Sequence, residues 1–166
     1  VDLAAGEAKV FAAVPGVPGE FPAVVRVARE GGEYVLDNGR LAVFVPATAG
    51  EGVPAPLLGL RVNGRRFGAG RWVSGRERVS LRSEVIDPGR VGGRVRLRYD
   101  FGTPETGERF SEVTVSLYPD RPFAPVEERH RVDASSRWEF DLTSGMGALT
   151  RDRSLALIVA KRTCRS

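Results

Sequence analysis

Residues 94 to 101 read RVRLRYDF, and this octapeptide constrains the fold more than any other part of the chain. Its apolar residues Val95, Leu97, Tyr99 and Phe101 alternate with three arginines and an aspartate. Such alternation gives a β-strand one apolar face for a core and one polar face for water. Because the same period of two recurs along most of the chain, the sequence predicts an all-β protein.

Turn signals separate these alternating segments. The pairs Asn38-Gly39 and Asn63-Gly64 each lie between two apolar runs, and Asn-Gly indicates a hairpin because the tight turn needs positive φ. The Asp-Pro-Gly at 87–89 predicts another reversal of the chain. We expect strands at residues 10–14, 22–28, 34–36, 41–45, 57–62, 65–67, 79–86, 94–101, 110–118, 126–132, 138–142 and 155–160.

Many short strands joined by hairpins, without crossover helices, imply antiparallel sheets that cover one another's apolar faces. We therefore predict an antiparallel two-sheet β-sandwich, with a closed barrel as the alternative. The chain has 166 residues, which suffices for one domain with its own core. We expect a single sandwich domain over 22–166, preceded by an extension or first strand at 1–21, and the abrupt ending suggests a fragment of a longer protein.

The chain carries 25 basic and 21 acidic residues, a formal net charge of +4. Nucleic acid is the first partner to consider for a basic chain. However, the acidic residues are mixed among the basic ones, and no run of five or more like charges occurs. This pattern favours solvated strand faces with cross-strand ion pairs over a polyanion-binding surface, so nucleic acid is not expected as a partner.

Several other classes of protein and site are excluded by what the sequence lacks. No apolar run approaches the roughly 20 residues of a spanning helix, so no membrane span is expected. Cys164 is the only cysteine and His130 the only histidine, which argues against disulfides, multi-ligand metal centres and a Ser-His-Asp triad. The glycines at 68–70 belong to no phosphate-binding motif. We expect neither a metal nor a cofactor.

The densest acid/base cluster is VEERHRV at 126–132. Alternation puts Glu128 and His130 on one strand face, about 6.5–7 Å apart along the backbone. At that distance the two groups could hold one ligand or act as acid and base. The alternative is a salt-bridged surface strand in which Glu127 and Glu128 pair with Arg129 and Arg131.

Wide aromatic rings are the second candidate feature. Rings beside acids and arginines are typical of sugar sites, because a pyranose stacks on the ring while its hydroxyls bind polar groups. Packing in the core is the alternative for a tryptophan in a β-domain. Trp72 lies in the loop-like GAGRWVSGR, so we expect it to be more exposed than Trp138.

Three segments carry a family resemblance: EYVLDNGRLAVFV, LLGLRVNGRRF and FSEVTVSLYPDRPFAPVEERHRV. Across residues 22–142 the chain resembles the β-sandwich modules of bacterial carbohydrate-active proteins, in the galactose-mutarotase-like and rhamnogalacturonan-lyase-like groups. The resemblance implies a supersandwich or jelly-roll fold that sits beside glycans. Mutarotase-like chemistry needs a glutamate and more than one histidine, whereas this chain supplies only His130.

We therefore expect a non-catalytic accessory domain that binds oligo- or polysaccharides, acidic ones by preference. Its ligand-binding residues would be Trp72, Tyr118, Glu128, Arg129 and His130. The resemblance favours an extracellular or periplasmic location, although one cysteine leaves the compartment open.

Two alternatives come from other classes of protein. The first is a structural sandwich that assembles through strand edges. The second is a lyase- or hydrolase-like enzyme in which Glu127 or Glu128 works with His130. In that enzyme, Asp100, Glu139 or Asp141 could complete a carboxylate pair.

Overall fold

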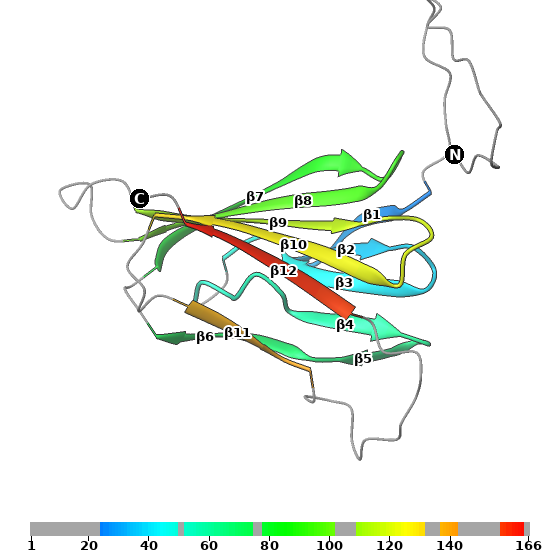
Figure 1. Cartoon of the computed structure of the whole chain (residues 1–166), viewed down its shortest axis with the longest axis horizontal. Coiled ribbons are helices and arrows are strands. Elements are labelled where there is room, and N and C mark those ends of the chain that lie inside the picture. Colours follow the sequence, from blue (N-terminus) through cyan, green and yellow to red (C-terminus); the bar gives the residue numbers. More distant parts are fainter. Residues whose placement is uncertain are drawn as a thin grey trace, which may run out of the picture.

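The computed structural model describes residues 24–49, 52–74, 78–101, 109–131, 137–142 and 157–164. The regular structure in these ranges consists of β-strands arranged in three sheets (Figure 1). None of the described residues belongs to a helix with the length and hydropathy that a transmembrane segment needs. The predicted strand at 10–14 and the extension at 1–21 lie outside the described residues.

Sheet A is a five-stranded antiparallel meander in which each strand pairs with the next along the chain. Its strands are β1 (Arg26–Glu30), β2 (Glu33–Asp37), β3 (Leu41–Pro46), β4 (Gly59–Val62) and β5 (Arg65–Phe67). Asn63 and Gly64 both have positive φ, 50° and 76°, as a type I′ hairpin requires. Both hairpins predicted from Asn-Gly pairs are therefore confirmed.

Sheet C forms the opposite layer, with the strand order β12-β10-β9-β8-β7. Its strands are β7 (Arg78–Pro88), β8 (Gly93–Phe101), β9 (Phe110–Leu117), β10 (Phe123–His130) and β12 (Leu157–Cys164). β7 to β10 pair antiparallel, but β12 runs parallel to β10. The chain leaves sheet C after β10 and returns only at β12, and such a crossover permits parallel pairing. The prediction of antiparallel sheets is therefore wrong for the pair β10 and β12. Because β12 and β9 flank β10, β10 is an inner strand of sheet C.

Sheet B consists of β6 (Ala69–Ser74) and β11 (Arg137–Asp141), paired antiparallel. The prediction of a loop at 68–76 is wrong, because β6 occupies most of that segment. The glycines that suggested a loop allow close packing: an added Cβ would overlap the Phe140 ring at Gly68 and the Leu57 carbonyl at Gly70. Gly68 also has a φ of 78°, where the chain passes from β5 into β6.

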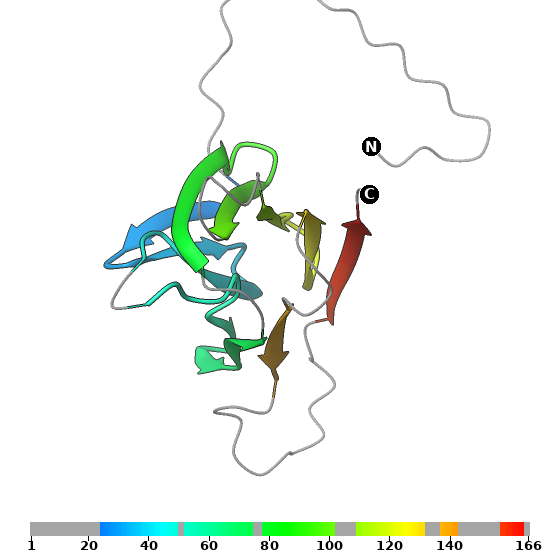
Figure 2. The same ribbon diagram turned by 90° about the vertical axis from the view of Figure 1, so that its left-hand side faces the viewer.

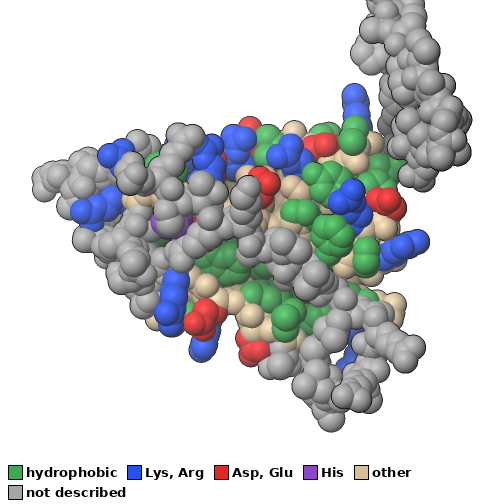
Figure 3. Space-filling model, in the orientation of Figure 1, with side chains coloured by type: hydrophobic (Ala, Val, Ile, Leu, Met, Phe, Trp, Pro, Cys, Tyr) green, Lys and Arg blue, Asp and Glu red, His purple; other side chains and the backbone are tan. Residues whose placement is uncertain are grey.

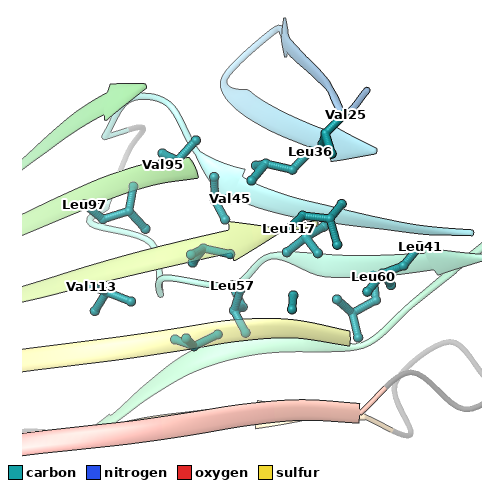
Figure 4. Close-up of a cluster of buried hydrophobic side chains, with 14 of the residues drawn as sticks. Val25, Leu36, Leu41, Val45, Leu57, Leu60, Val95, Leu97, Val113 and Leu117 are labelled. Atoms are coloured by element: carbon teal, nitrogen blue, oxygen red, sulfur yellow. The ribbon is translucent and has the colours of Figure 1, made fainter. Parts of the chain in front are cut away.

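Sheets A and B together form one layer that faces sheet C (Figures 1 and 2). The apolar faces of the two layers enclose one core, part of which Figure 4 shows. Its fully buried side chains are mostly aliphatic, and Trp72, Trp138 and Phe140 of sheet B pack against it. The predicted antiparallel β-sandwich is thus confirmed, with one of its layers divided into two sheets.

Backbone and amide hydrogen bonds tie the layers together at the end where sheet A faces sheet C. The side-chain nitrogen of Asn38 donates to the carbonyl oxygens of Tyr118, at 2.7 Å, and Arg121, at 2.9 Å. The backbone N–H groups of Val24 and Val25 donate to the Gly89 carbonyl at 2.9 and 3.1 Å. The Asn38-Gly39 pair, which predicted a hairpin turn, therefore also connects sheet A to the turn after β9 of sheet C.

Candidate functional site

The predicted acid/base pair lies on the inner face of β10. Burial alternates along this strand, so that Glu128 is half-buried and His130 is 7% exposed. Glu127 and Arg129 are exposed on the opposite face. The prediction that Glu128 and His130 share a face is confirmed, whereas Arg129 faces away from them.

A buried serine and a buried tyrosine lie in register beside this pair. Ser111 of β9 is opposite both His130 of β10 and Tyr99 of β8. Its hydroxyl donates a hydrogen bond of 2.9 Å to the carboxylate of Glu128. Sequence reasoning missed Ser111, although its place two residues before Val113 puts it on the apolar face of β9.

Trp72 of β6, in the opposite layer, packs against the inner face of sheet C beside these residues. Its ring packs edge-to-face on Tyr99, with centroids 5.1 Å apart, and on Phe101, with centroids 5.9 Å apart. Its indole N–H donates to the Pro54 carbonyl at 3.1 Å. Trp72 is half-buried in β6, so its ring packs against the core and does not form an exposed stacking platform.

We call this region, where sheet B covers sheet C, the polar end of the sandwich. It comprises Trp72, Tyr99, Ser111, Glu128 and His130. Three of the predicted ligand-binding residues, Trp72, Glu128 and His130, thus gather on the inner side of this end. Arg129 lies at the same end but on the outer face of β10, and Tyr118 lies elsewhere.

Tyr118 lies at the other end, directly after β9. The guanidinium of Arg121 is 5.6 Å from the ring centroids of both Tyr118 and Phe123. This arrangement belongs to the turn between β9 and β10, at the end held by Asn38. Tyr118 is therefore separate from the polar end.

The Tyr99 hydroxyl is the most buried polar group of the polar end. Tyr99 is 0% exposed, and its hydroxyl has no hydrogen-bond partner among the described residues. Burial raises the pKa of Tyr99 well above its ordinary value of 10.0. The hydroxyl therefore keeps its proton at neutral pH and can donate a hydrogen bond.

An open hollow of about 440 Å³ lies on the sheet B strands. It is lined by Ala69, Arg71, Glu139, Phe140 and Asp141. Register pairs Arg71 with Glu139 and Ala69 with Asp141, which places both carboxylates on one face of β11. Figure 3 shows acidic and basic side chains together along the lower margin of the molecule, over this sheet.

Glu139 is held between two arginines at the rim of this hollow. Arg71 donates to its carboxylate at 3.2 Å, and Arg137 lies 3.5 Å away. Of the three carboxylates that could complete an acid pair, Glu139 and Asp141 line the hollow, while Asp100 lies on β8 of the other layer. Within the described ranges, no group of three or more His, Cys, Asp or Glu residues could hold a metal ion.

Ion pairs organise the outer face of sheet C. Arg82 and Arg98 contact Asp100 at 3.0 and 3.1 Å, and Arg96 lies 3.8 Å from Glu84. Partial burial works to raise the pKa of Asp100, but hydrogen bonds from Ser80, Arg82 and Arg98 outweigh it and lower that pKa. The predicted cross-strand pairing of mixed charges is confirmed on this face.

No protein-family model, curated protein or solved structure matches this chain. The resemblance to galactose-mutarotase-like and rhamnogalacturonan-lyase-like modules therefore stays a prediction. The fold itself rests on the strands and their register.

Proposed function

We propose that this protein is a non-catalytic carbohydrate-binding β-sandwich domain and that the hollow on sheet B is its binding surface. The observation that carries the proposal is the lining of this hollow by a guanidinium, two carboxylates and an aromatic residue. Its volume of about 440 Å³ falls within the range of about 300–1,000 Å³ typical of small-molecule sites.

The chemistry of this lining suits a sugar. Carboxylates accept hydrogen bonds from hydroxyl groups, and a guanidinium donates to hydroxyl or carboxylate oxygens. Glu139 and Arg71 are already oriented by their mutual contact of 3.2 Å, which lowers the entropic cost of ordering them on a ligand. Arg71 and Arg137, which flank Glu139, can donate hydrogen bonds to a sugar carboxylate, so acidic as well as neutral glycans are candidate ligands.

The position of the acid/base pair favours a binding role over an enzymatic one. Glu128 already accepts the Ser111 hydroxyl, and His130 is almost fully buried on the inner face of β10. A general acid or base must reach the reacting group of a substrate within hydrogen-bond distance. Glu139 and Asp141, the carboxylates that line the hollow, lie on the other layer.

Edge-to-edge assembly receives less support from the strands at the sheet margins. β7 is a long edge strand, but its pairing with β8 is irregular at Arg78/Ser80 and at Val85/Asp87. Such irregularities twist an edge and hinder the addition of another strand. At the margin of sheet A, β5 has only three residues.

Affinity electrophoresis through gels that contain acidic or neutral polysaccharides tests the proposal. We expect retardation by at least one polysaccharide. Arg71→Ala should lower the affinity for an acidic polysaccharide about tenfold or more, and Glu139→Gln should lower the affinity for a neutral one by a similar factor, because it removes a charged acceptor of sugar hydroxyl groups. Arg82→Ala is the matched control, because Arg82 is also an exposed arginine in an ion pair, on the other layer. If no glycan retards the native chain, or if all three variants behave alike, the proposal is wrong.

A further inference from the structure

Two buried hydrogen-bond donors at the polar end have no acceptor among the described residues. They are the hydroxyl of Tyr99 and one terminal nitrogen, Nη1, of Arg109. A guanidinium can only donate, and a buried donor without an acceptor is destabilising. Two such donors on one face of a sheet are a rare feature of a folded protein and point to an acceptor that the described residues do not supply.

Strand register brings these two residues to the same part of the inner face. The Arg109 carbonyl accepts the N–H of Phe101 at 3.0 Å, so Arg109 lies beside the end of β8. Phe110 lies under the guanidinium of Arg98, 4.4 Å away, on the outer face. Alternation then places Arg109 on the inner side with Ser111, which is opposite Tyr99.

We infer that the polar end binds the carboxylate group of an acidic ligand between Tyr99 and Arg109. A carboxylate offers two acceptor oxygens and a negative charge, and its hydrogen bonds with a guanidinium are among the stronger ones in proteins. Arg109 is only partly buried whereas Tyr99 is fully buried, so the carboxylate would enter past Arg109 and reach the hydroxyl last.

Glu128 provides a discriminating test because its negative charge lies beside this position. Its carboxylate accepts the Ser111 hydroxyl, and glutamine at this position would keep an acceptor oxygen for that bond. If the site binds a carboxylate, Glu128→Gln removes a like charge and should strengthen binding several-fold. Unchanged or weaker acetate binding by Glu128→Gln would contradict a carboxylate site beside Glu128.

The experiment is a heteronuclear NMR titration of the full chain with acetate, galacturonate and galactose. Acetate carries the carboxylate without a sugar, so this inference can stand even if the sugar-binding proposal fails. We expect saturable shifts at β8, β9 and β10 with acetate and with galacturonate. Galactose should leave these strands unshifted.

Two conservative variants and two controls complete the test. Tyr99→Phe should weaken acetate binding by about three- to tenfold, and Arg109→Gln by about tenfold or more. Tyr118→Phe and Arg121→Gln change the same residue types at the opposite end and should have no effect. The absence of saturable shifts with acetate, or equal affinities for Tyr99→Phe, Arg109→Gln and the native chain, would overturn the inference.

Discussion

The two ends of the sandwich share the strands of sheet C but differ in their side chains and in the sheet that covers them. We call the end where sheet A faces sheet C the aliphatic end. Along β8, β9 and β10 the inner residues change character from that end to the polar end. At and toward the aliphatic end they are Val95, Leu97, Val113, Val115, Leu117, Ala124 and Val126. At the polar end they are Tyr99, Phe101, Ser111, Glu128 and His130, of which only Phe101 carries no polar group.

Along β8, β9 and β10 the inner and outer residues alternate with a period of two at both ends, so the backbone of these strands does not distinguish the ends. What differs is the free energy of the buried side chains. Aliphatic groups gain from leaving water, whereas a buried hydroxyl or guanidinium costs free energy until it finds a partner. Polar groups thus interrupt the apolar inner face at three adjacent strands, and this is where the proposed carboxylate site lies.

The largest expected effect is at the aliphatic end. Leu36 is fully buried there, and Leu36→Ala should lower the free energy of unfolding by about 2–5 kcal/mol, because it leaves a cavity. Urea denaturation followed by circular dichroism measures this. Val91→Ala is the control, since Val91 is 74% exposed and should change stability by less than about 0.5 kcal/mol. Equal effects of the two substitutions would mean that Leu36 does not lie in a packed core.

Gly93 tests how closely the two layers approach each other. A Cβ at this position would lie 2.8 Å from a methyl group of Val27 and 2.9 Å from one of Val25. Gly93→Ala should therefore destabilise the fold by about 1–3 kcal/mol through overpacking. Gly52→Ala, where no atom lies within 4 Å of the added Cβ, should be nearly neutral. A neutral Gly93→Ala would show that the sheets are further apart than described.

At the polar end we expect a substitution to raise the free energy of unfolding instead of lowering it. Tyr99→Phe removes a buried hydroxyl that has no hydrogen-bond partner among the described residues, so the ligand-free protein should become more stable by up to about 1 kcal/mol. Thermal unfolding in a buffer without carboxylates or phosphate measures this. A loss of stability would mean that the hydroxyl has a partner within the chain, and the contrast between the two ends would then disappear.

The smallest effect concerns the outer face of sheet C and depends on pH. Hydrogen bonds from Ser80, Arg82 and Arg98 lower the pKa of Asp100, so its stabilising contribution is present above the unfolded-state pKa near 3.8 and is lost as pH falls through the folded-state value. Asp100→Asn should thus cost about 0.2–1 kcal/mol at pH 7, as partly exposed ion pairs do. The difference should vanish below about pH 3. A cost that is independent of pH would exclude this electrostatic origin.

The sequence predicted most strands and turns because alternation and Asn-Gly pairs are local signals. Two errors have physical causes that no local pattern contains. The strand β6 was not predicted, because Gly68 and Gly70 are typical of a loop. These positions are glycine because Phe140 and Leu57, from distant segments of the chain, pack closely against them. The parallel pairing of β12 depends on where the chain goes between β10 and β12, and not on the residues of either strand.

The candidate site was predicted only in part, for a related reason. Glu128 and His130 stood out as a titratable cluster, and alternation correctly put them on one face. Ser111 and Arg109 join them only through the register of β9 against β8 and β10, which pattern alone does not give. Trp72 was predicted near a ligand as a stacking platform, but its ring packs on Tyr99 and Phe101.

The contrast between the two ends is tested most directly by one titration of the isotopically labelled chain with galacturonate. The account predicts saturable amide shifts confined to β6, β11 and the polar ends of β8, β9 and β10. Shifts centred on the turn between β9 and β10, near Tyr118, or no saturable shifts at all, would contradict it.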